Sequence, residues 1–154
     1  MKALDSIDLK ILEVLQRDSK ISNKALAMQI GLSTSPTFER IRRLEKQGYI
    51  KKFVAICDAK KLNRNLEAFC QVTLEHHSEE LIKKFEAKIK QLPMVESCYH
   101  IAGNHDYLLR VRSTDMESFQ DFIVKQLARI PNVSNVQSSF VMASVKDDTA
   151  IDLS

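Results

Sequence analysis

The chain has 154 residues, of which 44% are hydrophobic and 28% charged, a composition typical of a folded protein with one domain or two small ones. It contains neither a run of eighteen apolar residues nor an apolar signal-peptide core, so we expect no membrane span and a cytoplasmic location. Three widely spaced cysteines without a CxxC pair also fit a reducing compartment. Residues 1–65 carry fourteen Lys and Arg against seven Asp and Glu, whereas residues 66–154 carry nine against thirteen. This asymmetry indicates two domains, the first suited to a polyanion such as DNA.

The basic part predicts three short helices, at about 5–17, 22–30 and 34–47. Asp5 and Ser22 can cap the first two, and apolar residues then recur at helical spacing. Gly31 suits the left-handed residue that ends a helix. The third helix starts with small hydroxyl residues and carries three arginines. Two capped helices joined by a tight turn, with these residue types in the second, are typical of a helix-turn-helix.

The third helix has the side chains that a DNA-recognition helix needs. Small residues at its start allow close approach to the major groove, and exposed helix N–H groups attract phosphate. Arginine reads guanine with two hydrogen bonds or clamps phosphate. We expect Phe38, Ile41 and Leu44 to face the core, and the arginines to spread over the remaining surface. The alternative is an ordinary helical hairpin with a solvated arginine face.

After Gly48 the sequence becomes rich in β-branched and aromatic residues, and residues 49–57 predict a strand. Such a strand could form a wing beside the helices, on which Lys51 and Lys52 would contact phosphate, or it could be a plain connector with solvated lysines. We assign residues 1–58 to the DNA-binding domain, 59–65 to a linker and 66–154 to a second domain.

The second part alternates between strand and helix patterns. Strands are expected at 66–75, 95–102, 107–112 and within 133–145, and helices at 79–91 and 115–129. The order β-α-β-β-α-β is that of a ferredoxin-like domain, so the whole chain is expected to be α+β. Helices would cover one face of the sheet, and a second copy of the chain would most economically cover the other, which predicts a dimer.

Other combinations of reactive residues do not predict chemistry. His76 and His77 are adjacent, so on a strand they would point to opposite faces and could not chelate one ion together. With three glycines, no clustered acid pair and no nucleophile motif, the chain offers little from which to build an active site. We therefore expect no metal site and no enzymatic activity.

Taken together, these residues resemble those of the Lrp/AsnC (leucine-responsive, "feast/famine") family of prokaryotic transcription regulators over about residues 4–147. The first domain carries the resemblance in Asp5-x-x-Asp8-x-x-Ile11-Leu12, Ile21-Ser22-Asn23, Ile30-Gly31-Leu32-Ser33 and Glu39-Arg40-Ile41-Arg42-Arg43-Leu44-Glu45-x-x-Gly48-Tyr49-Ile50. The second carries it in Gly103-x-x-Asp106-Tyr107-Leu108-Leu109-Arg110-Val111 and Pro131-x-Val133. The resemblance implies a winged helix-turn-helix followed by a ferredoxin-like, amino-acid-sensing domain. It also implies homodimers that assemble further, often into octamers.

The resemblance also places an effector pocket where dimers meet, around the turn between the second and third strands. The residues it implies there are Gly103, Asn104, His105, Asp106 and Tyr107, with Ser139, Phe140, Val141 and Met142 of the last strand. Asp106 could accept from the ammonium of an amino acid, and a glycine turn offers N–H groups to its carboxylate. Alternatively, the turn is only a hairpin that Asp106 caps. The chain departs from the commonest family pattern at Asn104 and His105, which leaves the effector open.

We interpret the chain as a sequence-specific regulator that binds double-stranded DNA and responds to a small molecule, an amino acid being the first choice, without any other cofactor. The candidate DNA-binding residues are Asn23, Ser33, Thr34, Ser35, Thr37, Arg40, Arg42, Arg43, Lys51 and Lys52. Two alternatives are an architectural DNA-compacting protein without an effector and an amino-acid-binding regulatory subunit of an enzyme. The first would show little sequence preference, and the second would not need the arginines between 40 and 43.

Overall fold

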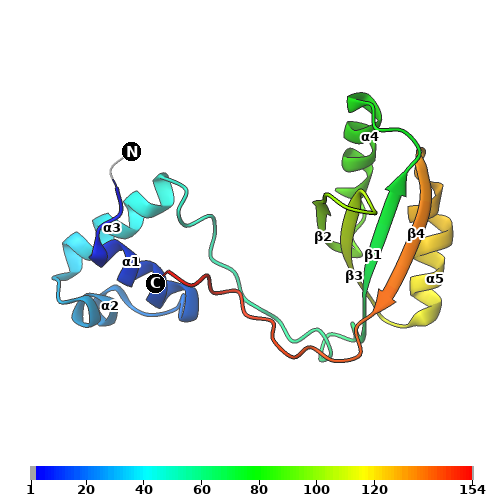
Figure 1. Ribbon diagram of the computed structural model, residues 1–154. Coiled ribbons are helices and arrows are strands. Elements are labelled where there is room, and N and C mark those ends of the chain that lie inside the picture. The colour runs from blue at the N-terminus through cyan, green and yellow to red at the C-terminus, as the bar shows by residue number, and fades with distance from the viewer. Residues whose placement is uncertain (1–2, 154) are drawn as a thin grey trace. The chain divides into compact units, whose positions relative to one another are not determined.

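A computed structural model describes residues 3–153, and these form two compact units (Figure 1). The first unit contains the residues up to Ile56 together with those from Lys146 on, and the second contains Cys57–Val145. The C-terminal segment, which we had assigned to the second domain, thus groups with the first unit. Residues 1, 2 and 154 of the assigned domains lie outside the described part of the chain.

Three helices form the first unit: α1 (Ser6–Arg17), α2 (Asn23–Ile30) and α3 (Thr34–Lys46). All three were predicted, and their ends are set by local chemistry. The Asp5 carboxylate accepts from two N–H groups of the first turn of α1, and the Ser22 hydroxyl accepts from the N–H of Ala25 in α2. Gly31 ends α2 at a φ of +71°, a conformation that glycine adopts without a Cβ clash. The helices pack around five buried residues, namely Ile11, Leu26, Ile30, Ile41 and Leu44.

The expectation that Phe38 faces this core is wrong, because 44% of its surface is exposed. Residues three apart on a helix are rotated by roughly 60° from each other, so a row of three such positions drifts around the axis. Thr37, which is fully buried, takes the core position in the first turns of α3 instead. Phe38 is therefore turned toward solvent.

The expected wing strand is also absent: residues 49–57 are not assigned to a strand, and no other segment of the described chain pairs with them. Phe53, Val54 and Ile56 are exposed there. β-branched and aromatic residues favour a strand only where a partner supplies hydrogen bonds and packing. The prediction of a strand at residues 49–57, which was based on composition alone, is therefore wrong.

The side chain of Gln16 on α1 bonds to the C-terminal segment. The Gln16 amide donates to the carbonyl oxygen of Ile151 at 3.2 Å and accepts from the N–H of Ile151 at 2.6 Å. The amide of Gln16 thus bonds to both backbone groups of Ile151, as a residue of a neighbouring strand would. Beside it lies an apolar groove of about 510 Å³, lined by α1, residues 49–56 and the C-terminal segment.

The second unit has the predicted order of strands and helices. It contains β1 (Leu66–Leu74), α4 (Glu79–Ile89), β2 (Val95–His100), β3 (Tyr107–Ser113), α5 (Met116–Lys125), the short 3-10 helix η1 (Leu127–Arg129) and β4 (Val133–Phe140). The four strands form one antiparallel sheet in the order β2-β3-β1-β4 (Figure 1).

The two faces of this sheet differ in chemistry. Alternate residues of β1 and β3, among them Val72 and Leu109, are buried in a core shared with residues of α4 and α5. The other face exposes Phe69 and Tyr99 and carries a cluster of four charged residues, Glu67, Glu96, Arg110 and Arg112. Within it, Arg112 is 2.9 Å from Glu67 and 2.7 Å from Glu96. The open face is therefore mixed, with an ionic part over β1, β2 and β3.

Candidate DNA-binding and effector sites

A cluster of ion pairs joins α1 to α3. Asp8 is only 1% exposed, and both of its carboxylate oxygens accept from Nη2 of Arg43, at 2.6 and 2.5 Å. Nη1 of Arg40 donates to Asp8 and to Asp5, each at 2.7 Å. The hydrogen bond from Arg40 holds the pKa of the Asp5 carboxyl below its usual value. A buried carboxylate needs such charged donors, since burying it unpaired would be strongly unfavourable.

Three of the candidate DNA-binding residues are consequently turned inward. Arg40 and Arg43 reach toward α1 instead of spreading over the outer surface, so the expectation for these two arginines is corrected. Thr37 is fully buried, and its hydroxyl donates to the carbonyl oxygen of Ser33 at 2.9 Å. Its side chain therefore offers no surface to DNA.

The remaining candidates lie at the surface of the first unit. Ser33, Thr34 and Ser35 are exposed at the start of α3, and the hydroxyl of Ser33, at the N-cap position, makes no capping bond. Arg42 is exposed on the outer side of the same helix. The other exposed candidates are Asn23 at the start of α2, and Lys51 and Lys52 after α3. The structure thus offers polar and cationic groups around one exposed helix.

The turn between β2 and β3 is anchored to the end of β1 and the segment after it. The N–H of Asp106 donates to Val72, and its carboxylate accepts from the N–H of Leu74 at 2.7 Å. The second oxygen of Asp106 lies 2.8 Å from Nε2 of His77. The Leu74 N–H, and after it His77, lower the pKa of the Asp106 carboxyl. Asp106 therefore fastens this turn, the simpler of the two roles considered for it.

The other turn residues differ in exposure. Gly103, at a φ of +147°, and Asn104 are exposed, and a Cβ on Gly103 would meet nothing within 4 Å. Nδ1 of His105 lies 3.1 Å from the hydroxyl of Thr73 on β1. Tyr107 is almost fully buried on the helix-covered face of the sheet.

The two segments expected to form the effector pocket do not meet within one chain. On β1, Tyr107 is paired with Val72, whereas Phe140 is paired with Ala68. Four residues of strand separate these pairs, roughly 13 Å, and the turn and Met142 extend away from each other beyond them. In addition, Phe140 packs its ring against Phe119 of α5, with the ring centres 5.1 Å apart.

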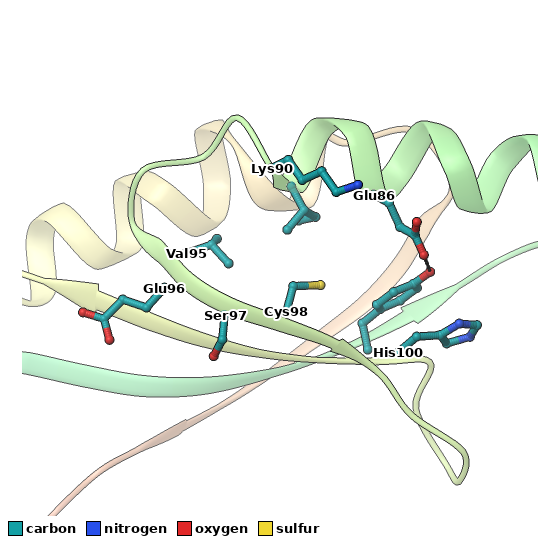
Figure 2. Close-up of a pocket in the computed structure, with 9 residues that line it drawn as sticks. Glu86, Lys90, Val95, Glu96, Ser97, Cys98 and His100 are labelled. Carbon is teal, nitrogen blue, oxygen red and sulfur yellow. Dashed lines mark hydrogen bonds between the residues drawn. The ribbon is translucent and has the colours of Figure 1, made fainter. Parts of the chain in front are cut away.

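A pocket that the sequence did not predict lies between α4 and the edge strand β2 (Figure 2). It has a volume of about 420 Å³, and its lining includes Tyr107, whose hydroxyl donates to Glu86 at 3.0 Å. The His100 ring is stacked on Tyr107, with centres 4.7 Å apart. Figure 2 shows Cys98 on the side of β2 that faces α4. Burial raises the pKa of the Cys98 thiol to about 11, which favours the protonated form at neutral pH.

Comparison with known families assigns both parts of the chain. A family model described as "Lrp/AsnC ligand binding domain" matches residues 67–151, and one described as "Winged helix-turn-helix DNA-binding" matches residues 4–51. The chain belongs to the Lrp/AsnC family of transcriptional regulators. The predicted fold class is thereby confirmed, as is the role as a DNA-binding regulator.

Several relatives of this Lrp/AsnC regulator match over nearly their full length. The Bkd operon transcriptional regulator of Pseudomonas aeruginosa is 39% identical over 145 residues, which cover 94% of this chain and 95% of the relative. The leucine-responsive regulatory protein of Escherichia coli is 35% identical over 150 residues, covering 97% and 92%. A solved transcriptional regulator from Neisseria meningitidis, in complex with L-Met, has a TM-score of 0.94 at 34% identity, covering 98% of this chain and 97% of that one.

Residues 3–153 contain neither a membrane-spanning helix nor a cluster of metal ligands. Every helix among residues 3–153 is too short or too polar to span a lipid bilayer. In the same range, no three His, Cys, Asp or Glu side chains form a group that could hold a metal ion. The sequence reasoning missed the role of Asp8, although its acidic side chain within the apolar face of α1 was a signal for a buried ion pair.

Proposed function

We propose that this Lrp/AsnC regulator contacts double-stranded DNA through the outer side of α3. Ser33, Thr34 and Ser35 would approach the groove and its phosphates, and Arg42 would lie deeper in the groove. Asn23, Lys51 and Lys52 would contact the backbone on either side. The observation that carries this assignment is that Arg42, unlike Arg40 and Arg43, is exposed and has no carboxylate partner within the described residues. A cation without a partner at the outer side of such a helix is suited to a nucleic acid.

We further propose that the effector is a free amino acid with an apolar side chain. The relative from N. meningitidis was solved in complex with L-Met, and its match with this chain covers 97% of its own length. Here the exposed part of the turn, Gly103 and Asn104, with the partly exposed His105 and Asp106 behind it, offers polar groups for the ammonium and carboxylate. Met142, 95% exposed, offers an apolar wall. Because these segments lie at opposite ends of one sheet, the pocket would take the turn from one copy of the chain and the strand from another.

This proposal requires assembly. The open face of the sheet, with Phe69 and Tyr99 exposed on it, would be covered by a second copy, and dimers would associate into an octamer with pockets between them. We also propose that the regulator acts in the cytoplasm and catalyses no reaction. The ionic part of the open face would then have to meet charges of the partner, so dimerisation would depend on salt.

The experiment is a calorimetric titration of the full chain with each of the twenty amino acids. Any amino acid that binds is then added to a titration of the regulator on DNA selected from a random library. We expect an apolar amino acid to bind more tightly than millimolar and to change DNA affinity roughly five- to 150-fold. If none binds more tightly than millimolar, the effector assignment is wrong. If no DNA sequence is selected over the random pool, the specific DNA-binding role is wrong.

A further inference from the structure

The three arginines of α3 have two different environments. Arg40 and Arg43 are bonded to the carboxylates of Asp5 and Asp8. Arg42 instead lies over an aromatic ring: its guanidinium carbon is 5.9 Å from the centre of the Phe38 ring. This distance lies within the range of a cation–π interaction, and the spacing of four residues places both side chains on one side of the helix.

Phe38 and Arg42 occupy the surface of α3 that faces away from the core. The buried positions of this helix are Thr37, Ile41 and Leu44. At about 100° per residue, Arg42 lies on the opposite side of the axis, and Phe38 lies on the flank beside it. Nearly half of the Phe38 side chain, 44%, is exposed to solvent. An aromatic surface is thus presented next to a guanidinium that has no carboxylate partner among residues 3–153.

The Phe38 ring attracts the Arg42 guanidinium without using its hydrogen-bond donors. A guanidinium lying on an aromatic face keeps its planar fork of N–H donors open at the edge, because the ring occupies only its face. The attraction to the ring also restricts a long, flexible side chain before it meets its target. Less conformational entropy is then lost when the fork binds.

We propose that Phe38 and Arg42 act together as the sequence-reading pair of this regulator. Arg42 donates two hydrogen bonds to O6 and N7 of a guanine in the major groove, and the exposed edge of Phe38 packs on the C5 methyl of a neighbouring thymine. The fork of arginine matches guanine, and an apolar side chain matches the thymine methyl. Successive base pairs are about 3.4 Å apart, so two neighbouring side chains on one side of a helix can reach adjacent bases. The inference rests on the proposed docking of α3 in the groove.

The test begins with the full chain and a random double-stranded DNA library, from which its preferred site is selected. Binding to this site, to each single-base-pair variant of it and to a scrambled duplex is then measured by fluorescence anisotropy at one salt concentration. The proteins compared are the parent, Arg42→Ala, Arg42→Lys and Phe38→Ala. Arg17→Ala is the matched control, because Arg17 is an exposed arginine of the same unit at the end of α1.

Arg42→Ala is expected to weaken binding to the selected site by roughly five- to 150-fold and to become indifferent to one G·C base pair. Arg42→Lys keeps the charge but not the fork, so it should retain binding to the scrambled duplex and show the same indifference. Arg17→Ala should lower the affinity for the selected and the scrambled duplex by the same factor, or leave both affinities unchanged.

The contribution of Phe38 can be isolated by changing the DNA alone. Uracil lacks only the C5 methyl of thymine, so one thymine next to the guanine is replaced by uracil. This should weaken the parent about fourfold, the contribution of one methyl group, and leave Phe38→Ala unchanged. Both side chains are at the surface, and unchanged circular dichroism spectra and melting temperatures would show that the variants fold.

The inference is overturned if the Phe38 and Arg42 variants lose affinity equally for selected and scrambled DNA, since the pair would then contact only the backbone. It is also overturned if the uracil duplex weakens the parent and Phe38→Ala to the same extent. A parent that selects no sequence would contradict the proposed function itself, and the reading pair with it. If the parent selects a site that other residues recognise, specific DNA binding stands and only the assignment of Phe38 and Arg42 is wrong.

Discussion

In the first unit, the residues proposed to contact DNA lie on one helix and on segments near it in the chain, whereas the proposed effector residues of the second unit lie at the two ends of one sheet. A single copy of the chain already presents the exposed side of α3. No single copy brings the turn at Gly103 to the strand end at Met142, because the register of β1 separates them.

The comparison shows how differently the two candidate sites depend on the rest of the molecule. On α3, each side chain's role follows from its position around one helix axis and from the carboxylates of α1. In the second unit, the role of a residue depends on strand register and on a second copy. The predictions below test each side of this difference.

The largest effect is expected from Asp8→Ala. It would leave Arg40 and Arg43 without their buried partner and should reduce the free energy of unfolding by about 3 kcal/mol, the lower end for a broken buried ion pair, because both arginines are partly exposed. Thermal unfolding followed by circular dichroism measures this change. Glu13→Ala, an exposed acid of the same helix, is the control and should change the melting temperature little. Equal shifts for both variants would mean that the cluster does not hold α1 to α3.

The next effect concerns the turn at Asp106. Asp106→Ala leaves the N–H of Leu74 without its acceptor and should lower the free energy of unfolding by about 2 kcal/mol. Asp106→Asn keeps an acceptor and should lose less. Urea denaturation at pH 7 distinguishes the two variants. If alanine is no more disruptive than asparagine, the bond to Leu74 does not fasten the turn.

The same carboxylate predicts a dependence on pH. Its pKa is lowered in the folded protein, so its contribution to stability is fully present above the unfolded value of about 3.9 and is lost as the pH falls through the folded value. At pH 5, where the carboxylate is ionised, the parent should therefore have a higher melting temperature than Asp106→Asn. Below pH 4 the difference should narrow. A difference that widens below pH 4 would contradict the lowered pKa.

Smaller effects are expected where the proposed contacts are only to phosphate. Lys51→Ala or Lys52→Ala should weaken all DNA sequences alike and reduce the slope of log affinity against log salt by about one for each lysine. Anisotropy titrations between low and moderate salt measure the slope. A loss confined to one sequence would place the lysine at a base edge instead.

Much of the fold could be predicted because its signals are local. Asp5, Ser22 and Gly31 mark helix ends within a few residues, and the alternation of buried and exposed residues marks β1 and β3. The prediction for Phe38 was wrong because residues spaced by three drift around the helix axis and stay on the buried side for only about two turns. The wing strand was expected from composition, which does not reveal whether a partner strand exists.

The site was harder to predict because its decisive contacts are distant in sequence. Arg43 and its partner Asp8 are 35 residues apart, so the sequence pattern of α3 alone could not distinguish Arg43 from Arg42. The separation of the turn from Met142 depends on the register of β1 with both of its neighbours. Register is fixed by packing across the whole sheet, not by the sequence of one strand.

The most direct test of the two-copy pocket is a mixing experiment with two variants that fail in different halves of the site. Asp106→Asn removes the negative charge at the turn, and Met142→Asp places a charge in the apolar wall of the other half. Each variant is titrated calorimetrically with the amino acid that the parent binds, and then both are co-expressed in equal amounts and titrated again. If the pocket takes one half from each of two copies, each variant alone binds nothing, and the random mixture recovers about a quarter of the parent's sites. If the mixture binds no more amino acid than the separate variants do, a pocket shared between copies is contradicted.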